Sequence, residues 1–198
     1  MQSEPTTAPL RRVVLIVALL NLAYFGVEFA VALSIGSVSL FADSVDFLED
    51  TSVNLLIFSA LSWTAVTRAR VGMAMAGILL VPSLALLWAL LRKFTYPVPP
   101  EPFALSLTGV GALSVNLFCA FLLARFRSHS GSLTRAAFLS ARNDAVANVA
   151  IIGAGLVTAY LWQTVWPDVI VGVAIAAMNI DAAREVWEAA REEHKAVA

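Results

Sequence analysis

The chain has 198 residues, of which 60% are hydrophobic and only 14% are charged. A soluble domain of this size cannot hide so much apolar surface, because a small globule leaves much of its surface exposed. A net charge of −1 gives no electrostatic basis for binding nucleic acid. The single cysteine, Cys119, excludes an intramolecular disulfide and is expected to be a small buried apolar residue. The composition therefore predicts an integral membrane protein.

Six apolar stretches are long enough to cross about 30 Å of hydrocarbon as helices. The predicted fold is an all-α membrane protein, a bundle of six transmembrane helices over residues 13–186. A cytoplasmic N-terminal segment of residues 1–12 and a short cytoplasmic tail of residues 187–198 flank it. The predicted spans are 13–35, 39–65, 72–91, 103–126, 135–162 and 165–186.

Basic residues near the ends of the spans gather on one side of the membrane. That side has Arg11, Arg12, Arg68, Arg70, Arg125, Arg127, Arg135, Arg184, Arg191 and Lys195, and the other has Arg92 and Lys93. Because basic residues are retained on the cytoplasmic side, both termini are expected to face the cytoplasm. The expected location is the bacterial inner (plasma) membrane.

The second span carries four acidic residues, although charged groups are costly in hydrocarbon. At 100° per residue, Asp43, Asp46, Asp50 and Asn54 fall on one face of the helix, and Glu49 lies further round. For Glu49 the choice between a structural and a functional role stays open. The shared face predicts that the other acids act together.

The fifth span repeats this pattern with Ser140, Asp144 and Asn148 on one face, while Arg142 points to the opposite side. Oxygens from two helices can surround one cation, and close carboxylates can hold protons when no cation is bound. The alternative is that the acids satisfy helix ends or pair with Arg142. One arginine cannot neutralise three acids, so cation-for-proton exchange is favoured.

A third polar stripe lies in the first span, where it either lines an access route or makes hydrogen bonds between helices. Its members are Asn21, Tyr24 and Glu28. Near the start of the last span, Asp168 follows Pro167 and is expected to cap that helix.

The segment GSVSLFADSVDFLED (residues 36–50) resembles the second span of the cation diffusion facilitators, with Asp46 and Asp50 on its His/Asp-x-x-x-Asp pair. The segment LTRAAFLSARND (residues 133–144) is similar to the fifth span of that family, with Asp144 on the second acid of its motif. The first-span stripe, Asn116 in the fourth span and Pro167-Asp168 in the sixth also resemble the family.

The resemblance implies a ligand site between the second and fifth helices, a homodimer in the lipid bilayer, and metal efflux driven by proton entry. The implied metal ligands are Asp46, Asp50, Asp144 and Ser140. Residues of the pathway or of proton coupling would be Asp43, Glu28, Asn21, Tyr24, Glu49, Asn143 and Asn148. No prosthetic group is expected, and the divalent ion is the substrate.

Two features depart from the family pattern. Ser140 stands where the family has a fourth ligand, and a neutral hydroxyl is a weak metal ligand. An all-oxygen site favours a hard ion such as manganese, while iron, cobalt and zinc stay open. The chain also ends soon after the sixth span, where the family usually continues into a cytoplasmic domain, so a dimer would rest on membrane helices.

Two other functions compete with cation efflux. A degenerate, non-transporting relative with a structural or regulatory role is suggested by Ser140. A membrane enzyme could hold magnesium on paired carboxylates, but it would need basic residues near the metal to hold a diphosphate. Arg142 is the only intramembrane candidate, since the other basic residues lie at or beyond the span ends, and it points away, so no enzymatic activity is expected.

Overall fold

The computed structural model describes residues 7–60, 84–126 and 131–178, and it describes side chains for residues 8–58, 84–126 and 140–178. Four long helices lie in this part of the chain: α1 (Thr7–Ile35), α2 (Val38–Ala60), α4 (Pro102–Ala124) and α5 (Gly131–Tyr160). Further helical segments cover residues 84–95 and Trp166–Met178. The predicted all-α class is therefore confirmed for these residues.

The predicted spans agree with the helices to within a few residues wherever the structure describes them. The structure does not describe residues 1–6, 61–83, 127–130 and 179–198. Most of the third predicted span and the whole predicted tail 187–198 therefore lie outside the described part. The same holds for six of the basic residues used to predict the orientation. These are Arg68, Arg70, Arg127, Arg184, Arg191 and Lys195.

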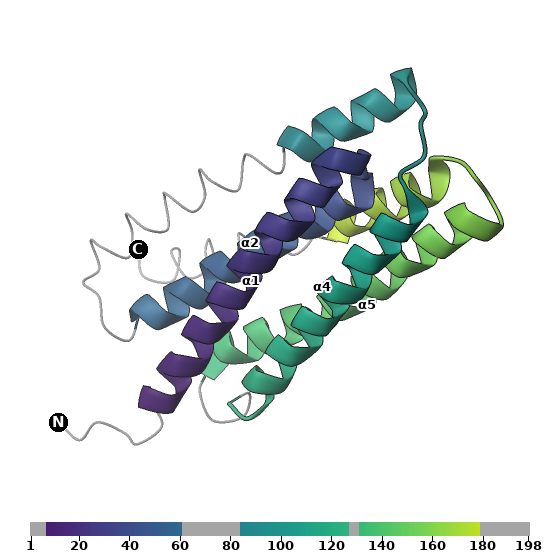
Figure 1. Cartoon of the computed structure of the whole chain (residues 1–198). Helices are drawn as coiled ribbons and strands as arrows, with labels where there is room; N and C mark the ends of the chain where they lie inside the picture. The colour runs from purple at the N-terminus through teal and green to yellow at the C-terminus, as the bar shows by residue number, and fades with distance from the viewer. Residues whose placement is uncertain (1–6, 61–83, 127–130, 179–198) are drawn as a thin grey trace.

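The long helices form a bundle in which α1 and α5 run in one direction and α2 and α4 run in the opposite one (Figure 1). Helix α1 packs against α2 and α4, and α5 packs against α4 and α2. The two helices that carry the predicted acidic faces, α2 and α5, are therefore direct neighbours.

Large apolar side chains cover the outside of the bundle, whereas most of the acids and amides of the described residues are buried within it. Water would favour the reverse distribution, and lipid favours this one. Among the described helices, Ala8–Ile35 and Pro102–Ala124 are apolar and long enough to span a membrane by themselves. Helix α2 has a similar length but carries four acidic residues. Examples of the outward-facing side chains are Leu19, Val27, Leu107, Phe118, Phe121, Val146 and Leu156.

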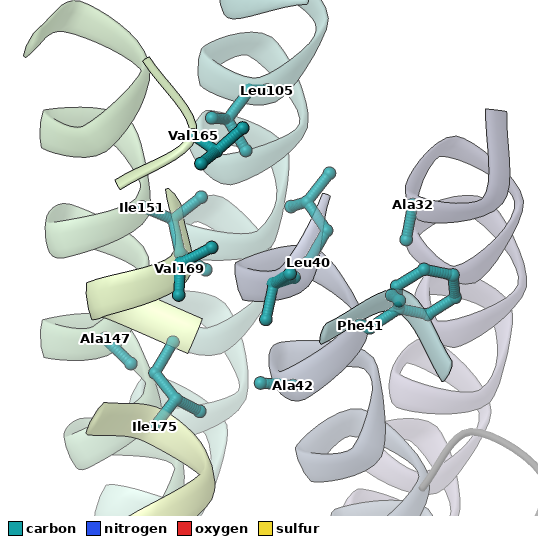
Figure 2. Close-up of a cluster of buried hydrophobic side chains, with 12 residues drawn as sticks. Ala32, Leu40, Phe41, Ala42, Leu105, Ala147, Ile151, Val165, Val169 and Ile175 are labelled. Carbon is teal, nitrogen blue, oxygen red and sulfur yellow. The ribbon is translucent and has the colours of Figure 1, made fainter. Parts of the chain in front are cut away.

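Two clusters of buried apolar side chains lie toward opposite ends of the bundle. The Phe41 cluster contains Ala32, Val38, Leu40, Phe41, Ala42, Ala89, Leu105, Ala147, Ile151, Val165, Val169 and Ile175 (Figure 2). The Leu123 cluster contains Leu10, Val14, Val17, Ile57, Cys119, Ala120, Leu123 and Ala141. Along α1, α2 and α4, buried polar residues lie between the parts that enter these two clusters, and on α5 the partly exposed Asp144 lies there. The burial of Cys119, a free thiol in the second cluster, confirms its predicted apolar role.

The turn between α1 and α2 is as short as predicted. Gly36 has a φ of +65°, a left-handed conformation that glycine adopts without steric cost. The next amide, Ser37 N–H, donates to the carbonyl of Ala32 at 3.2 Å. This is the bond of a Schellman motif, and it ends α1 at Ile35, so that only Gly36 and Ser37 separate α1 from α2.

The first turn of α2 is capped by a residue from the far end of the chain. The Asp168 carboxylate accepts hydrogen bonds from the amides of Val38 and Ser39, at 2.8 and 3.1 Å, and from the hydroxyls of Ser37 and Ser39, at 2.6 and 2.7 Å. The Leu40 amide donates to Ser37 Oγ at 3.1 Å. The prediction that Asp168 caps its own helix was therefore wrong in its target. The fully buried carboxylate instead joins the last helix to α2.

Lys93, which follows the third predicted span, is buried near the same end of the bundle. Its ammonium donates to the carbonyl of Val98 at 2.5 Å. Burial lowers the pKa of Lys93, and the negative charge of Asp168 opposes that change. Asp168 therefore faces a buried cation as well as the start of α2.

Replacement of Asp168 by alanine should destabilise the protein by about 3 kcal/mol, because it leaves several buried donors without an acceptor. Glu101 offers a matched control, since it caps α4 by accepting from the amides of Phe103 and Ala104 but is exposed to the outside. Glu101→Ala should cost no more than about 1 kcal/mol. Unfolding in detergent measures both, and equal losses would contradict the role assigned to Asp168.

Candidate cation site between α2 and α5

The polar face predicted for α2 is buried along its whole length. Asp43, Asp46, Asp50 and Asn54 have exposed fractions of 0, 8, 4 and 1%. Glu49 is only half-buried, which agrees with its predicted place further round the helix. The helical period therefore located this face correctly from the sequence.

Helix α5 brings its predicted polar residues against this face. Ser140 Oγ donates a hydrogen bond of 2.8 Å to Asp50 Oδ1. Asp144 lies within hydrogen-bonding reach of Asp50. Of the acids that act electrostatically on Asp46, Asp144 has the largest effect. Asp50, Asp144 and the Ser140 hydroxyl therefore meet between the two helices, with Asp144 and Ser140 partly exposed and Asp46 close enough to interact electrostatically.

These side chains interact in pairs. Asp144 acts electrostatically on Asp46 and lies within hydrogen-bonding reach of Asp50, and Asp50 accepts from Ser140. Within the described residues, no group of three or more histidine, cysteine, aspartate or glutamate side chains is arranged as a ready cage for a metal ion. Binding of one ion by all four residues would therefore require side chains to rotate toward a common point.

Two residues on α5 lie away from this interface. Arg142 is exposed, as its predicted position opposite Asp144 requires. Asn143, a predicted neighbour of the pathway, is exposed as well. Neither side chain is buried among the acids.

A chain of amides connects Asp43 to α5 and α4. Asn148 Nδ2 donates to Asp43 Oδ2 at 2.6 Å, and Asn116 Nδ2 donates to Asn148 Oδ1 at 3.0 Å. All three side chains are buried, with exposed fractions of 2% or less. Both asparagines therefore direct their N–H groups toward the Asp43 end of the chain.

Helix α1 contributes the third predicted polar stripe. Asn21 and Glu28 are fully buried, and the Tyr24 hydroxyl donates to the carbonyl of Thr108 at 2.6 Å. The Cys119 thiol lies 4.0 Å from Asn21 Oδ1. Tyr24 and Asn21 thus contact α4, while Glu28 lies beside Asp43 of α2.

Several residues that bind the buried polar side chains to one another were predicted only in part, or not at all. Asn116 entered only through the family resemblance, and Thr108 not at all, because a backbone carbonyl can be supplied by any residue. Ser37 and Ser39 follow a glycine at the start of a helix, which is a signal for capping. Nothing in that signal identifies their distant partner.

Comparison with protein families matches residues 14–192 to the cation efflux transmembrane domain. The match covers most of the 198 residues, so the chain belongs to the cation efflux family, and it is a membrane protein of a family that transports metal cations. The resemblance inferred from residues 36–50 and 133–144 is thereby confirmed. A comparison with curated proteins finds no significant match to the sequence.

The hydrogen bonds that link Asn116, Asn148 and Asp43 should contribute to the free energy of unfolding. Asn148→Ala would leave both Asp43 Oδ2 and Asn116 Nδ2 without a partner, at a cost of about 2–4 kcal/mol. Asn143→Ala removes the same side chain from an exposed position of the same helix and should stay within about 0.5 kcal/mol of the parent. Thermal unfolding in detergent compares the two, and a similar change in both variants would refute the importance of the chain.

Proposed function

We propose that this protein exports a divalent metal cation by proton-coupled antiport, with Asp46, Asp50, Asp144 and Ser140 as the cation site. The observation that carries the proposal is the Ser140–Asp50 hydrogen bond of 2.8 Å with Asp144 beside it. It brings acidic side chains of α2 and α5 together where lipid would otherwise exclude charge. Membership of the cation efflux family supports the substrate class.

The donor set favours a hard cation. Three carboxylates and a hydroxyl offer only oxygen, which suits Mn²⁺ better than the softer ions. Iron, cobalt and zinc are further candidates for the same site. Ser140 would act mainly by orienting Asp50, because its hydroxyl hydrogen is already directed at that carboxylate.

Protons and the cation would compete for the same oxygens. Asp50 and Asp144 can form a hydrogen bond with each other only when a proton lies between them. A divalent cation that replaces protons of equal total charge leaves the charge of the buried site unchanged, which limits the electrostatic cost of each exchange. The reverse exchange at the other membrane face would complete the antiport cycle.

The two apolar clusters would act as the closures of the pathway. The acids lie between the Phe41 cluster and the Leu123 cluster along α2 and α5. If the helices rock so that one cluster separates at a time, the site opens to one face of the membrane and then to the other. Asp168 would make the last helix move together with the start of α2.

Arg11, Arg12 and Arg125 lie at one end of the described bundle and Arg92 and Lys93 at the other. By the charge rule the first end faces the cytoplasm, which gives outward export. We place the protein in a bacterial inner membrane, as a homodimer formed through membrane helices. We propose no enzymatic activity, because the exposed Arg142 is poorly placed to hold a diphosphate beside the acids.

Transport by reconstituted protein tests this function. In proteoliposomes, Asp46→Asn, Asp50→Asn and Asp144→Asn should each reduce Mn²⁺-driven proton flux at least about tenfold, because each removes a charged ligand worth about 1.5–3 kcal/mol. Arg142→Gln is the matched control, since it removes a charge from an exposed position of α5, and it should keep its flux. Flux at the parental rate in all three aspartate variants would end the proposal.

Binding measured alongside transport separates the remaining alternative. A non-transporting relative would show no calorimetric binding of any divalent ion to the parent protein. Ser140→Asp should then create binding, by supplying the fourth carboxylate. Binding together with flux in the parent protein supports the transporter.

A further inference from the structure

A second pair of acids lies apart from the Asp50–Asp144 contact. Glu28 of α1 and Asp43 of α2 are both fully buried, and their carboxyl groups are within hydrogen-bonding reach of each other. Apart from a proton shared between the two carboxyl groups, no hydrogen-bond donor of the described residues reaches either oxygen of Glu28 or Oδ1 of Asp43. An acidic pair this deeply buried and this poorly partnered is costly unless a positive species joins it.

The surrounding amides have already used the donors that they direct at this pair. Asn148 donates to Asp43 Oδ2, and Asn116 donates to Asn148. What is left over is an acceptor, because Asn116 Oδ1 is buried without a partner. Glu28 and Asp43 therefore present free oxygens to each other from α1 and α2. A ligand for these atoms must be positive and need no acceptor.

The other ionisable groups that act on the pair add no positive charge. Tyr24 of α1, Asp46 and Asp50 of α2, and Asp144 of α5 all interact electrostatically with Glu28 or Asp43. Each is neutral or negative. The field at the pair therefore attracts a cation, and carboxylate and amide oxygens are the ligands that hard divalent ions prefer.

We propose that the unpartnered carboxylates of Glu28 and Asp43 form a second binding station for the divalent cation. Toward the Phe41 cluster, Asp43 precedes Asp46 of the first site by three residues, or about 4.5 Å along a helix, and Asp50 by seven residues, or about 10 Å. The exported ion would pass from the site at Asp50 and Asp144 to this station before it leaves the bundle. The inference rests on the proposed function, since it assumes that the cation binds at Asp50 first.

Calorimetric titration with Mn²⁺ of the full-length protein in detergent tests the station. The parent protein should bind two ions per chain, and Glu28→Gln, which keeps the shape but not the charge, should bind one. Glu28→Asp keeps the charge, but its shorter side chain moves the carboxylate oxygens away from Asp43. This variant should still bind two ions, with the affinity of the ion at the station about tenfold lower. Asp50→Asn should lose the other ion and keep the one at Glu28.

Each outcome decides between distinct accounts. If Glu28→Gln binds as many ions as the parent protein, the station is overturned. If that variant also releases fewer protons per bound ion, Glu28 is a proton site and not a cation ligand. Binding of one ion by the parent protein, abolished by Asp50→Asn, would overturn the station and leave the proposed function intact. No binding by any variant or by the parent would overturn both. A melting curve of Glu28→Gln close to that of the parent confirms that the variant is folded.

Discussion

The cost of keeping carboxylates away from water governs how these helices pack. Acids on α2 are buried, so α1, α4 and α5 must present their own polar residues at the same depth. Asn148 meets Asp43, and Ser140 meets Asp50, through bonds of 2.6 and 2.8 Å. The apolar clusters then fall into place at either end of the polar layer. The pairing of buried polar groups thus determines both the register of the helices and the position of the candidate site.

The link between Asp168 and the start of α2 serves this constraint from outside the polar layer. A helix start deep in the bundle needs acceptors for its first amides, and Asp168 with Ser37 supplies them. This fixes the height of α2 and so the height of its acids. Because the bond joins the helix of the acids to the last helix, any rearrangement that carries α2 should carry the last helix with it.

Periodicity was enough to predict the buried face of α2 and the exposure of Arg142, because each depends on neighbours within a few residues. The bonds that assemble the site are of another kind. Asp168 reaches Val38 across 130 positions, and Ser140 reaches Asp50 across 90. A single sequence carries no signal for such pairs, since many acids and hydroxyls could have met. The capping role of Asp168 was therefore foreseen, but its partner was not.

The central claim is that acids of α2 and α5 hold one divalent cation. Anomalous X-ray diffraction from crystals grown with Mn²⁺ tests it most directly, because the signal identifies both the ion and its ligands. The account predicts a manganese peak between α2 and α5, with oxygens of Asp46, Asp50 and Asp144 at about 2.0–2.6 Å, the range for hard divalent ions. A crystal that binds manganese only elsewhere, with Asp144 turned toward lipid, would contradict it.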